Sequence, residues 1–89
     1  MMEGITNDGF VAGMSALAAG IAMLAAGLAG LGQGIASGTA AAAVGRQPEA
    51  RSEVQGTMII GLALTETSGI YALLVAVILL FVNPFGVSL

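Results

Sequence analysis

The sequence predicts an all-α membrane protein: a two-helix transmembrane hairpin that assembles into a homo-oligomeric ring. Three observations predict this class. Hydrophobic residues make up 57% of the 89 residues, charged residues make up only 8%, and two long segments are almost free of charge. A soluble domain normally carries about 25% charged residues. Lipid is therefore the solvent for most of a chain that forms one domain over residues 1–89.

The two apolar segments are each long enough to cross a bilayer. Residues 9–45 carry no formal charge, and residues 54–89 carry one, Glu66. A spanning helix needs about 20 apolar residues for a hydrocarbon core of about 30 Å. Strand-like alternation is missing, and two strands could not pair their backbone edges in lipid. We expect one helix at about 9–45 and a second at about 53–82.

A polar segment, RQPEARSE, separates the two helices and predicts a loop at about 46–52. Pro48 disfavours helical geometry at the residue before it and cannot donate a backbone hydrogen bond. Both arginines of the chain lie in this segment, so the positive-inside rule places the loop in the cytoplasm and both termini outside. The first eight residues contain no Lys or Arg, so we expect a mature N-terminus without a secretory signal.

Small residues mark one face of the first helix. Gly30, Gly34 and Gly38 form two overlapping GxxxG steps, and a seven-residue repeat joins Gly13, Gly20, Gly27 and Gly34. Such a face lets helix backbones approach closely in lipid, although flexible low-complexity sequence is the alternative reading. The second helix is rich in Leu, Ile and Val and suits contact with lipid. The glycine face must then pack against another copy, which favours a closed ring.

Glu66 is the most informative residue because it lies near the middle of the second apolar segment. A carboxylate at mid-membrane costs about 2.5 to 3.5 kcal/mol on insertion scales, so it indicates a functional site. A structural hydrogen bond from a protonated glutamic acid is the alternative. Gln33 is as far from the loop as Glu66 and should lie at the same depth, as an ion ligand or as an interhelical hydrogen-bonding residue.

Hydroxyl groups surround Glu66 at Thr65, Thr67, Ser68 and Tyr71. Each alone means little, because such hydroxyls often bond to a carbonyl four residues earlier. Together they form an oxygen-rich cluster of the kind that binds Na⁺, or carries H⁺, inside a membrane. Binding a cation neutralises Glu66, and the neutral site can then face lipid.

Several classes of function are excluded or disfavoured by composition. The chain has no Cys and no His, so the common zinc and haem sites cannot form. Two basic residues are too few for nucleic-acid binding. No nucleotide motif or nucleophile–base pair is present, so the chain is not expected to be an enzyme. A passive pore would need a polar stripe along its helices, and a purely structural hairpin would not need Glu66; these are the alternatives to an ion carrier.

The sequence resembles the c-subunit proteolipids that form the rotor ring of F-type ATP synthases. The resemblance covers nearly the whole chain and is carried by GQG, RQPEA, ETSGIY and the closing NPF. It implies a bacterial plasma membrane location and a ring that is surrounded by membrane lipid and exchanges ions with the synthase a-subunit. It also implies that Arg46, Gln47 and Pro48 contact the central-stalk subunits gamma and epsilon.

Within that family, the sodium-translocating members are most similar, because they combine a first-helix glutamine with a glutamate and a following hydroxyl residue. Proton-only members usually lack that hydroxyl, and a proton ring of the same architecture is the alternative. The resemblance implies a Na⁺ site shared by two neighbouring copies. Its parts would be the side chains of Gln33, Glu66 and Thr67, the carbonyl of Leu64, a water on Ser68, and the Tyr71 hydroxyl orienting the carboxylate.

Two features depart from the sodium-type pattern. Those relatives have a denser run of alternating glycines with a proline inside it, where this chain has AGLAGLGQG. Thr67 also stands where some relatives have serine, and it adds a methyl group that the site must accommodate.

Overall fold

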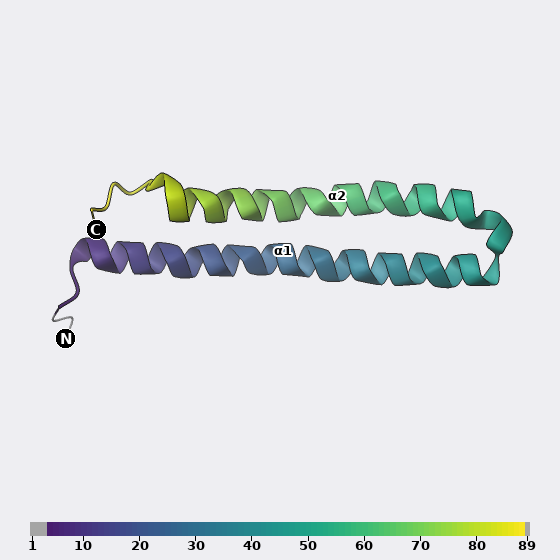
Figure 1. Cartoon of the computed structure of the whole chain (residues 1–89), viewed down its shortest axis with the longest axis horizontal. Helices are drawn as coiled ribbons and strands as arrows, with labels where there is room; N and C mark the ends of the chain where they lie inside the picture. Colours follow the sequence, from purple (N-terminus) through teal and green to yellow (C-terminus); the bar gives the residue numbers. More distant parts are fainter. Residues whose placement is uncertain (1–3, 89) are drawn as a thin grey trace.

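Two long antiparallel helices joined by a tight turn make up the protein in a computed structural model, which describes residues 4–88 (Figure 1). Helix α1 spans Asn7–Arg46 and helix α2 spans Arg51–Val77. A short 3-10 helix, η1, covers Pro48–Ala50 in the turn, and α2 continues into a π-helical turn, η2, at Ile78–Val82. The all-helical hairpin expected from the sequence is confirmed.

Local sequence sets the ends of the helices and makes the turn tighter than the sequence suggested. The Thr6 hydroxyl accepts a hydrogen bond from the backbone N–H of Gly9 at 2.9 Å, so α1 begins at Asn7, two residues before the charge-free segment 9–45. Gln47 has φ −135° and ψ 77°, outside the helical region, as expected for a residue before proline. Because α2 already begins at Arg51, only residues 47–50 separate the two helices, against the expected 46–52.

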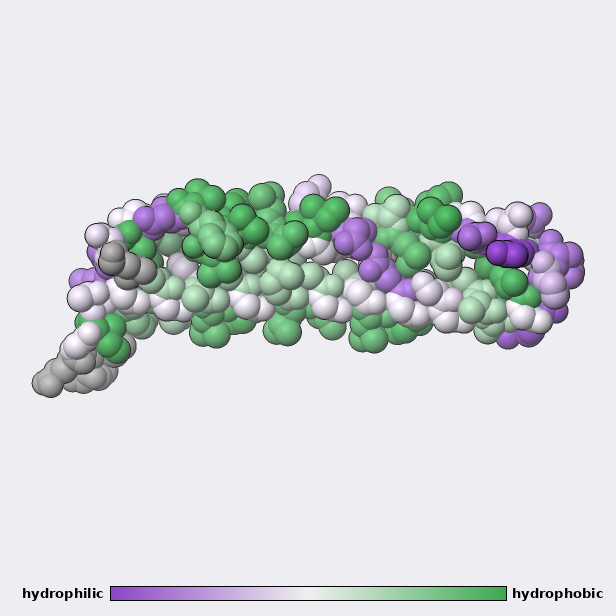
Figure 2. Space-filling view, in the orientation of Figure 1, coloured by the Kyte–Doolittle hydropathy of each residue, from purple (hydrophilic) through white to green (hydrophobic). Residues whose placement is uncertain are grey.

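Both arms of the hairpin are long and apolar enough to cross a membrane: Asn7–Arg46 and Pro48–Val82. The 40 residues of α1 extend about 60 Å at about 1.5 Å per residue, twice the hydrocarbon thickness of about 30 Å. The helix ends must therefore project into the headgroup region or beyond it. Figure 2 shows hydrophilic residues gathered at the turn, with largely hydrophobic surface along the arms and a second hydrophilic patch partway along.

The two termini of the described chain are tied together at the end opposite the turn (Figure 1). Asn83 ends the helix in a left-handed conformation, with φ 57°, and its side chain bonds to both the N–H and the carbonyl of Val87. The N–H of Ser88 then donates to the Asp8 carboxylate at 3.0 Å. These bonds fold the tail back against the start of α1.

Within one hairpin, α1 packs on α2 through small side chains. We call this set the alanine face; its members recur every three or four residues and are less exposed than their neighbours: Ala12, Ser15, Ala19, Ala22, Ala26, Ala29 and Gln33. The corresponding residues of α2 are Leu62, Thr65, Gly69, Ala72 and Ala76. Ala19 and Ala76 are 2% and 4% exposed, so the helices approach closely along this line.

The glycine repeat lies on a different side of α1 from the alanine face. Gly13, Gly20, Gly27 and Gly34 each directly follow an alanine-face residue, about 100° further round the helix. A methyl group added at any of these four positions would meet nothing within 4 Å. We call this open flank of the hairpin the glycine side. The hairpin's own second helix does not cover it.

The opposite flank of α1 carries large aliphatic side chains. Met14, Ile21 and Leu28 each directly precede an alanine-face residue, about 100° round in the other sense, and are 50%, 58% and 68% exposed. We call this flank the ridge side. Neighbours in a closed ring meet through unlike surfaces, so in the ring expected from the sequence the glycine side of one copy would face the ridge side of the next. Bulky side chains would then lie against a smooth backbone.

The open glycine side predicts that a large residue placed there blocks assembly without unfolding the hairpin. We expect Gly27→Leu to yield monomers or small oligomers, measured by native mass spectrometry after gentle detergent extraction. Leu24→Phe is the control, because it adds volume on the face of α1 opposite α2 and should leave the oligomer intact. A Gly27→Leu protein that assembles like the unmodified one would contradict close packing on the glycine side.

Candidate ion-binding site

Gln33 and Glu66 meet between the helices, partway along the hairpin. The Gln33 amide nitrogen donates to a Glu66 carboxylate oxygen at 2.6 Å and to the Leu62 carbonyl at 3.2 Å. The two residues are equally far from the turn, so the antiparallel register brings them level. Both N–H donors of Gln33 are engaged on α2, which leaves its amide oxygen, an acceptor, for another partner.

A small hollow of about 220 Å³ lies beside this pair on the hairpin surface. Its lining includes Met23, Ala26, Ile70 and Leu73, so the carboxylate has mainly apolar neighbours within its own chain. The hollow opens on the glycine side, because Met23 directly follows an alanine-face residue, as the glycines of the seven-residue repeat do. A carboxylate in such surroundings needs either a proton or a cation to balance its charge.

Gly69 lies beside the Glu66 carboxylate and against α1, a neighbour that sequence reasoning missed. A methyl group added there would lie 3.8 Å from the Ala26 Cα and 3.8 Å from a Glu66 oxygen. The Leu62 carbonyl was also missed as the second acceptor for Gln33. A glycine one turn after the carboxylate, facing two alanines of α1, was the available sequence signal for Gly69; nothing in the sequence singled out the Leu62 carbonyl.

The threonines beside Glu66 bond back to their own helix. Thr65 donates to the Gly61 carbonyl at 2.9 Å, and Thr67 donates to the Ala63 carbonyl at 3.3 Å. These bonds use the hydroxyl hydrogens and leave the oxygen lone pairs available as ligands. Thr65 faces α1, whereas Thr67 lies about 200° further round α2 and points away from it.

The other expected site residues lie on the flank away from Glu66. Leu64, Ser68 and Tyr71 each directly precede an α1-facing residue of α2, whereas Glu66 directly follows one. None of the three lines the hollow beside the carboxylate, and Leu64 and Tyr71 are 71% and 65% exposed. One hairpin therefore brings Gln33 and Glu66 together but not the complete expected ligand set.

The residues expected to contact a stalk lie at the tip of the hairpin. Arg46 ends α1, Gln47 breaks the helical geometry, and Pro48 begins η1. All three are exposed, at the far end of the molecule from both termini (Figure 1).

Comparison with known proteins identifies relatives of this hairpin. The family model for the ATP synthase C-subunit matches residues 9–79. The ATP synthase c-subunit of Alkaliphilus oremlandii is 54% identical over 83 residues, covering 93% of this chain and 94% of the relative. That of Lachnoclostridium phytofermentans is 55% identical over 80 residues, covering 90% of this chain and 93% of the relative.

The two hydrogen bonds from Gln33 predict how substitutions there change hairpin stability. Gln33→Leu removes both bonds and should cost on the order of 1 kcal/mol, because interhelical hydrogen bonds in membranes average about 0.6 kcal/mol each and reach about 1.7. Gln33→Glu should cost more at neutral pH, because a second carboxylate then faces Glu66 without a donor.

Protonation of one of the two carboxylates supplies the missing donor. Acidification should therefore restore the stability of the Gln33→Glu hairpin and leave that of the Gln33→Leu hairpin unchanged. Thermal loss of helicity in detergent, followed by circular dichroism at neutral and acidic pH, measures both effects. Equal stability of the two variants at every pH would show that the Gln33–Glu66 contact does not hold the helices.

Proposed function

The chain belongs to the ATP synthase c-subunit family, and on that premise we propose that its ring carries Na⁺ on Glu66 and couples the movement of that ion to rotation. Members of this family are rotor components of the synthase and are not themselves catalytic. The family forms oligomeric rings, and the hairpin has two arms suited to a membrane. The ion, its ligands and the partners of the ring belong to the proposal.

The observation that carries the proposal is the 2.6 Å contact between Gln33 and Glu66 in the middle of two apolar helices. An intramembrane carboxylate is costly and is retained for ion or proton transfer in transport proteins. The polar residues converge at one depth rather than lining the length of the hairpin, which favours an ion carrier over a passive pore.

Neighbouring copies would complete the site. Gln33 and Glu66 open on the glycine side, whereas Leu64, Ser68 and Tyr71 lie on the opposite flank of α2. Since unlike flanks meet in a ring, the carboxylate of one copy faces these three groups of the next. The Leu64 carbonyl, the Thr67 hydroxyl and a water held by Ser68 would then add oxygen ligands, and the Tyr71 hydroxyl would orient Glu66.

Oxygen chemistry favours Na⁺ as the coupling ion. A hard monovalent cation is bound by carboxylate, carbonyl and hydroxyl oxygens, all of which this arrangement supplies. The Gln33 amide would turn by half a rotation, directing its oxygen rather than its nitrogen at the ion. A proton would occupy Glu66 when Na⁺ is scarce or the pH is low, because a carboxylate accepts either.

Occupation of the site allows rotation. Na⁺ or H⁺ neutralises Glu66, so the loaded carboxylate can face lipid, whereas the bare charge would be held near the half-channels of the a-subunit. Each ion crossing releases about 2.3 kcal/mol per 100 mV of membrane potential. Arg46, Gln47 and Pro48, at a cytoplasmic turn, would pass the torque to subunits gamma and epsilon.

We expect Glu66→Gln to abolish Na⁺-driven ATP synthesis by the reconstituted synthase, because the amide cannot carry a cation as a neutral pair. The substitution keeps the side-chain size and can still accept a hydrogen bond from Gln33, so the ring should assemble normally on a native gel. Glu49→Gln, which neutralises a carboxylate in the turn, is the control and should retain synthesis. Persistent synthesis with Glu66→Gln would refute the assignment of Glu66.

A further inference from the structure

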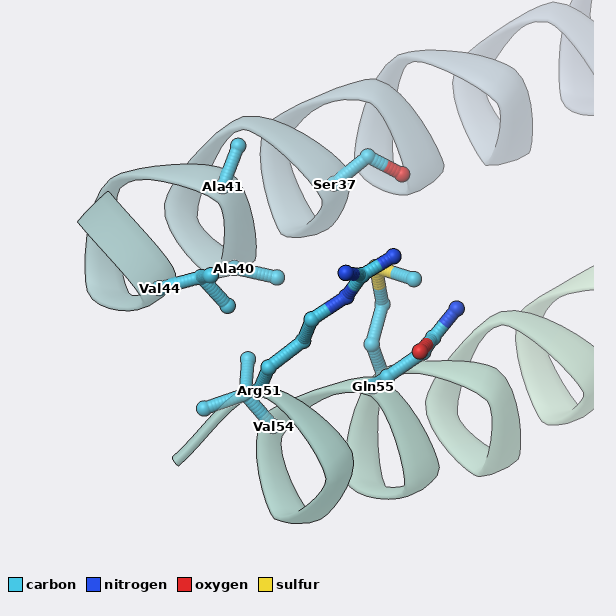
Figure 3. Close-up of a pocket in the computed structure, with 8 residues that line it drawn as sticks. Ser37, Ala40, Ala41, Val44, Arg51, Val54 and Gln55 are labelled. Atoms are coloured by element: carbon cyan, nitrogen blue, oxygen red, sulfur yellow. The ribbon is translucent and has the colours of Figure 1, made fainter. Parts of the chain in front are cut away.

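Arg51 and Glu53 lie on opposite flanks of the hairpin, at the end nearest the turn. Arg51 lines a groove of about 420 Å³ together with Ser37, Ala41 and Gln55. Its guanidinium lies in the space between the two helices, as Figure 3 shows. Glu53 lines a separate groove, whose other members include Thr39, Gln47 and Thr57. The two charges are two residues apart and thus about 200° apart around α2.

These grooves belong to the two flanks already defined on α1. Ala41 continues the seven-residue spacing of Gly27 and Gly34, so the Arg51 groove is on the glycine side. Ala40 faces α2 and lines both grooves. Thr39 directly precedes Ala40, just as the ridge-side residue Leu28 directly precedes Ala29, so the Glu53 groove is on the ridge side. Each copy therefore presents a cation on one flank and an anion on the other.

Neither charge has a partner in the part of its own hairpin that the structure describes. Among residues 4–88, the side-chain hydrogen bonds do not involve Arg51 or Glu53. The guanidinium nevertheless lies in a groove lined largely by alanine, valine and methionine. A planar group with five N–H donors in that position suits a carboxylate, which it can bind through two parallel hydrogen bonds.

We propose that Arg51 of each copy forms an ion pair with Glu53 of the next copy, closing a belt of alternating charges around the ring just inside the turn. Contact between unlike flanks juxtaposes the two grooves, and their charges are complementary. Arg51 and Glu53 differ in height by about 3 Å along α2, so the pair holds neighbours nearly level. It would thereby align the Glu66 hollow with the opposite flank of the next copy.

The inference rests on ring assembly, a family property, and not on the choice of Na⁺ or H⁺. Loss of the ion pair should weaken the ring without altering the chemistry at Glu66. A failed test of the belt would therefore leave the proposed ion site standing, and a failed test at Glu66 would leave the belt standing.

Charge reversal tests the pair. At low salt, Arg51→Glu and Glu53→Arg should each place like charges at every interface and lower the temperature at which the detergent-extracted ring dissociates on a gel. The double variant Arg51→Glu/Glu53→Arg restores opposite charges and should recover most of the lost stability. Glu49→Arg is the matched control, since it reverses a charge on a residue that lines neither groove, and it should leave the ring as stable as the unmodified one.

Two outcomes would overturn the proposal. If the double variant is no more stable than the single variants, Arg51 binds something other than Glu53, such as an anionic lipid headgroup. If the single reversals leave ring stability unchanged, no pair forms.

Cysteine cross-linking provides a test that does not depend on charge. The chain has no cysteine, so every disulfide would be an introduced one. Oxidation of Arg51→Cys/Glu53→Cys should produce a ladder of covalent multimers, because each interface joins one flank to the other. Disulfides within a chain are disfavoured, since the two Cβ vectors point apart. Arg51→Cys alone has one thiol per chain and can give at most a covalent dimer; it should give none, and a covalent dimer within the ring would contradict the pairing of unlike flanks.

Discussion

A single carboxylate between two apolar helices is the constraint on which the rest of the structure depends. Among residues 4–88, Glu66 accepts a hydrogen bond from the Gln33 side chain, and the hollow beside it is otherwise lined by apolar residues. Since an unbalanced charge at this depth is costly, the group must exchange its charge state or find further oxygens on another copy. Small side chains on both helices, with Ala19 and Ala76 almost fully buried, let α1 and α2 approach closely.

The two flanks of the hairpin differ from each other in the same way along its whole length. On α1, glycines follow the alanine face and aliphatic residues precede it; on α2, Glu66 follows an α1-facing residue while Leu64, Ser68 and Tyr71 precede one. Every level of the molecule therefore has two unlike sides. In the proposed ring, assembly by rotation alone would bring bulky side chains onto glycine and oxygen ligands onto the carboxylate, and within the hairpin only the Gln33 amide would turn.

Sequence reasoning predicted the features governed by composition and register. Hydropathy alone defined two helices, and equal distance from the turn placed Gln33 level with Glu66. Helix limits were less accurate, because the Thr6 cap and the compact turn at Pro48 are local interactions that hydropathy does not register. The Leu62 carbonyl could not be foreseen, since any backbone carbonyl can accept and only side-chain geometry selects one.

The rate at which dicyclohexylcarbodiimide labels the purified ring, mapped by mass spectrometry with and without Na⁺ over a pH series, most directly tests whether Glu66 carries the ion. This reagent attacks protonated carboxyl groups in apolar surroundings. The proposed function predicts labelling of Glu66 alone within the membrane, with Na⁺ protecting it in competition with protons. Labelling that ignores Na⁺ would contradict a sodium site and indicate a proton ring, and a Glu66 that never reacts would contradict its role as the carrier.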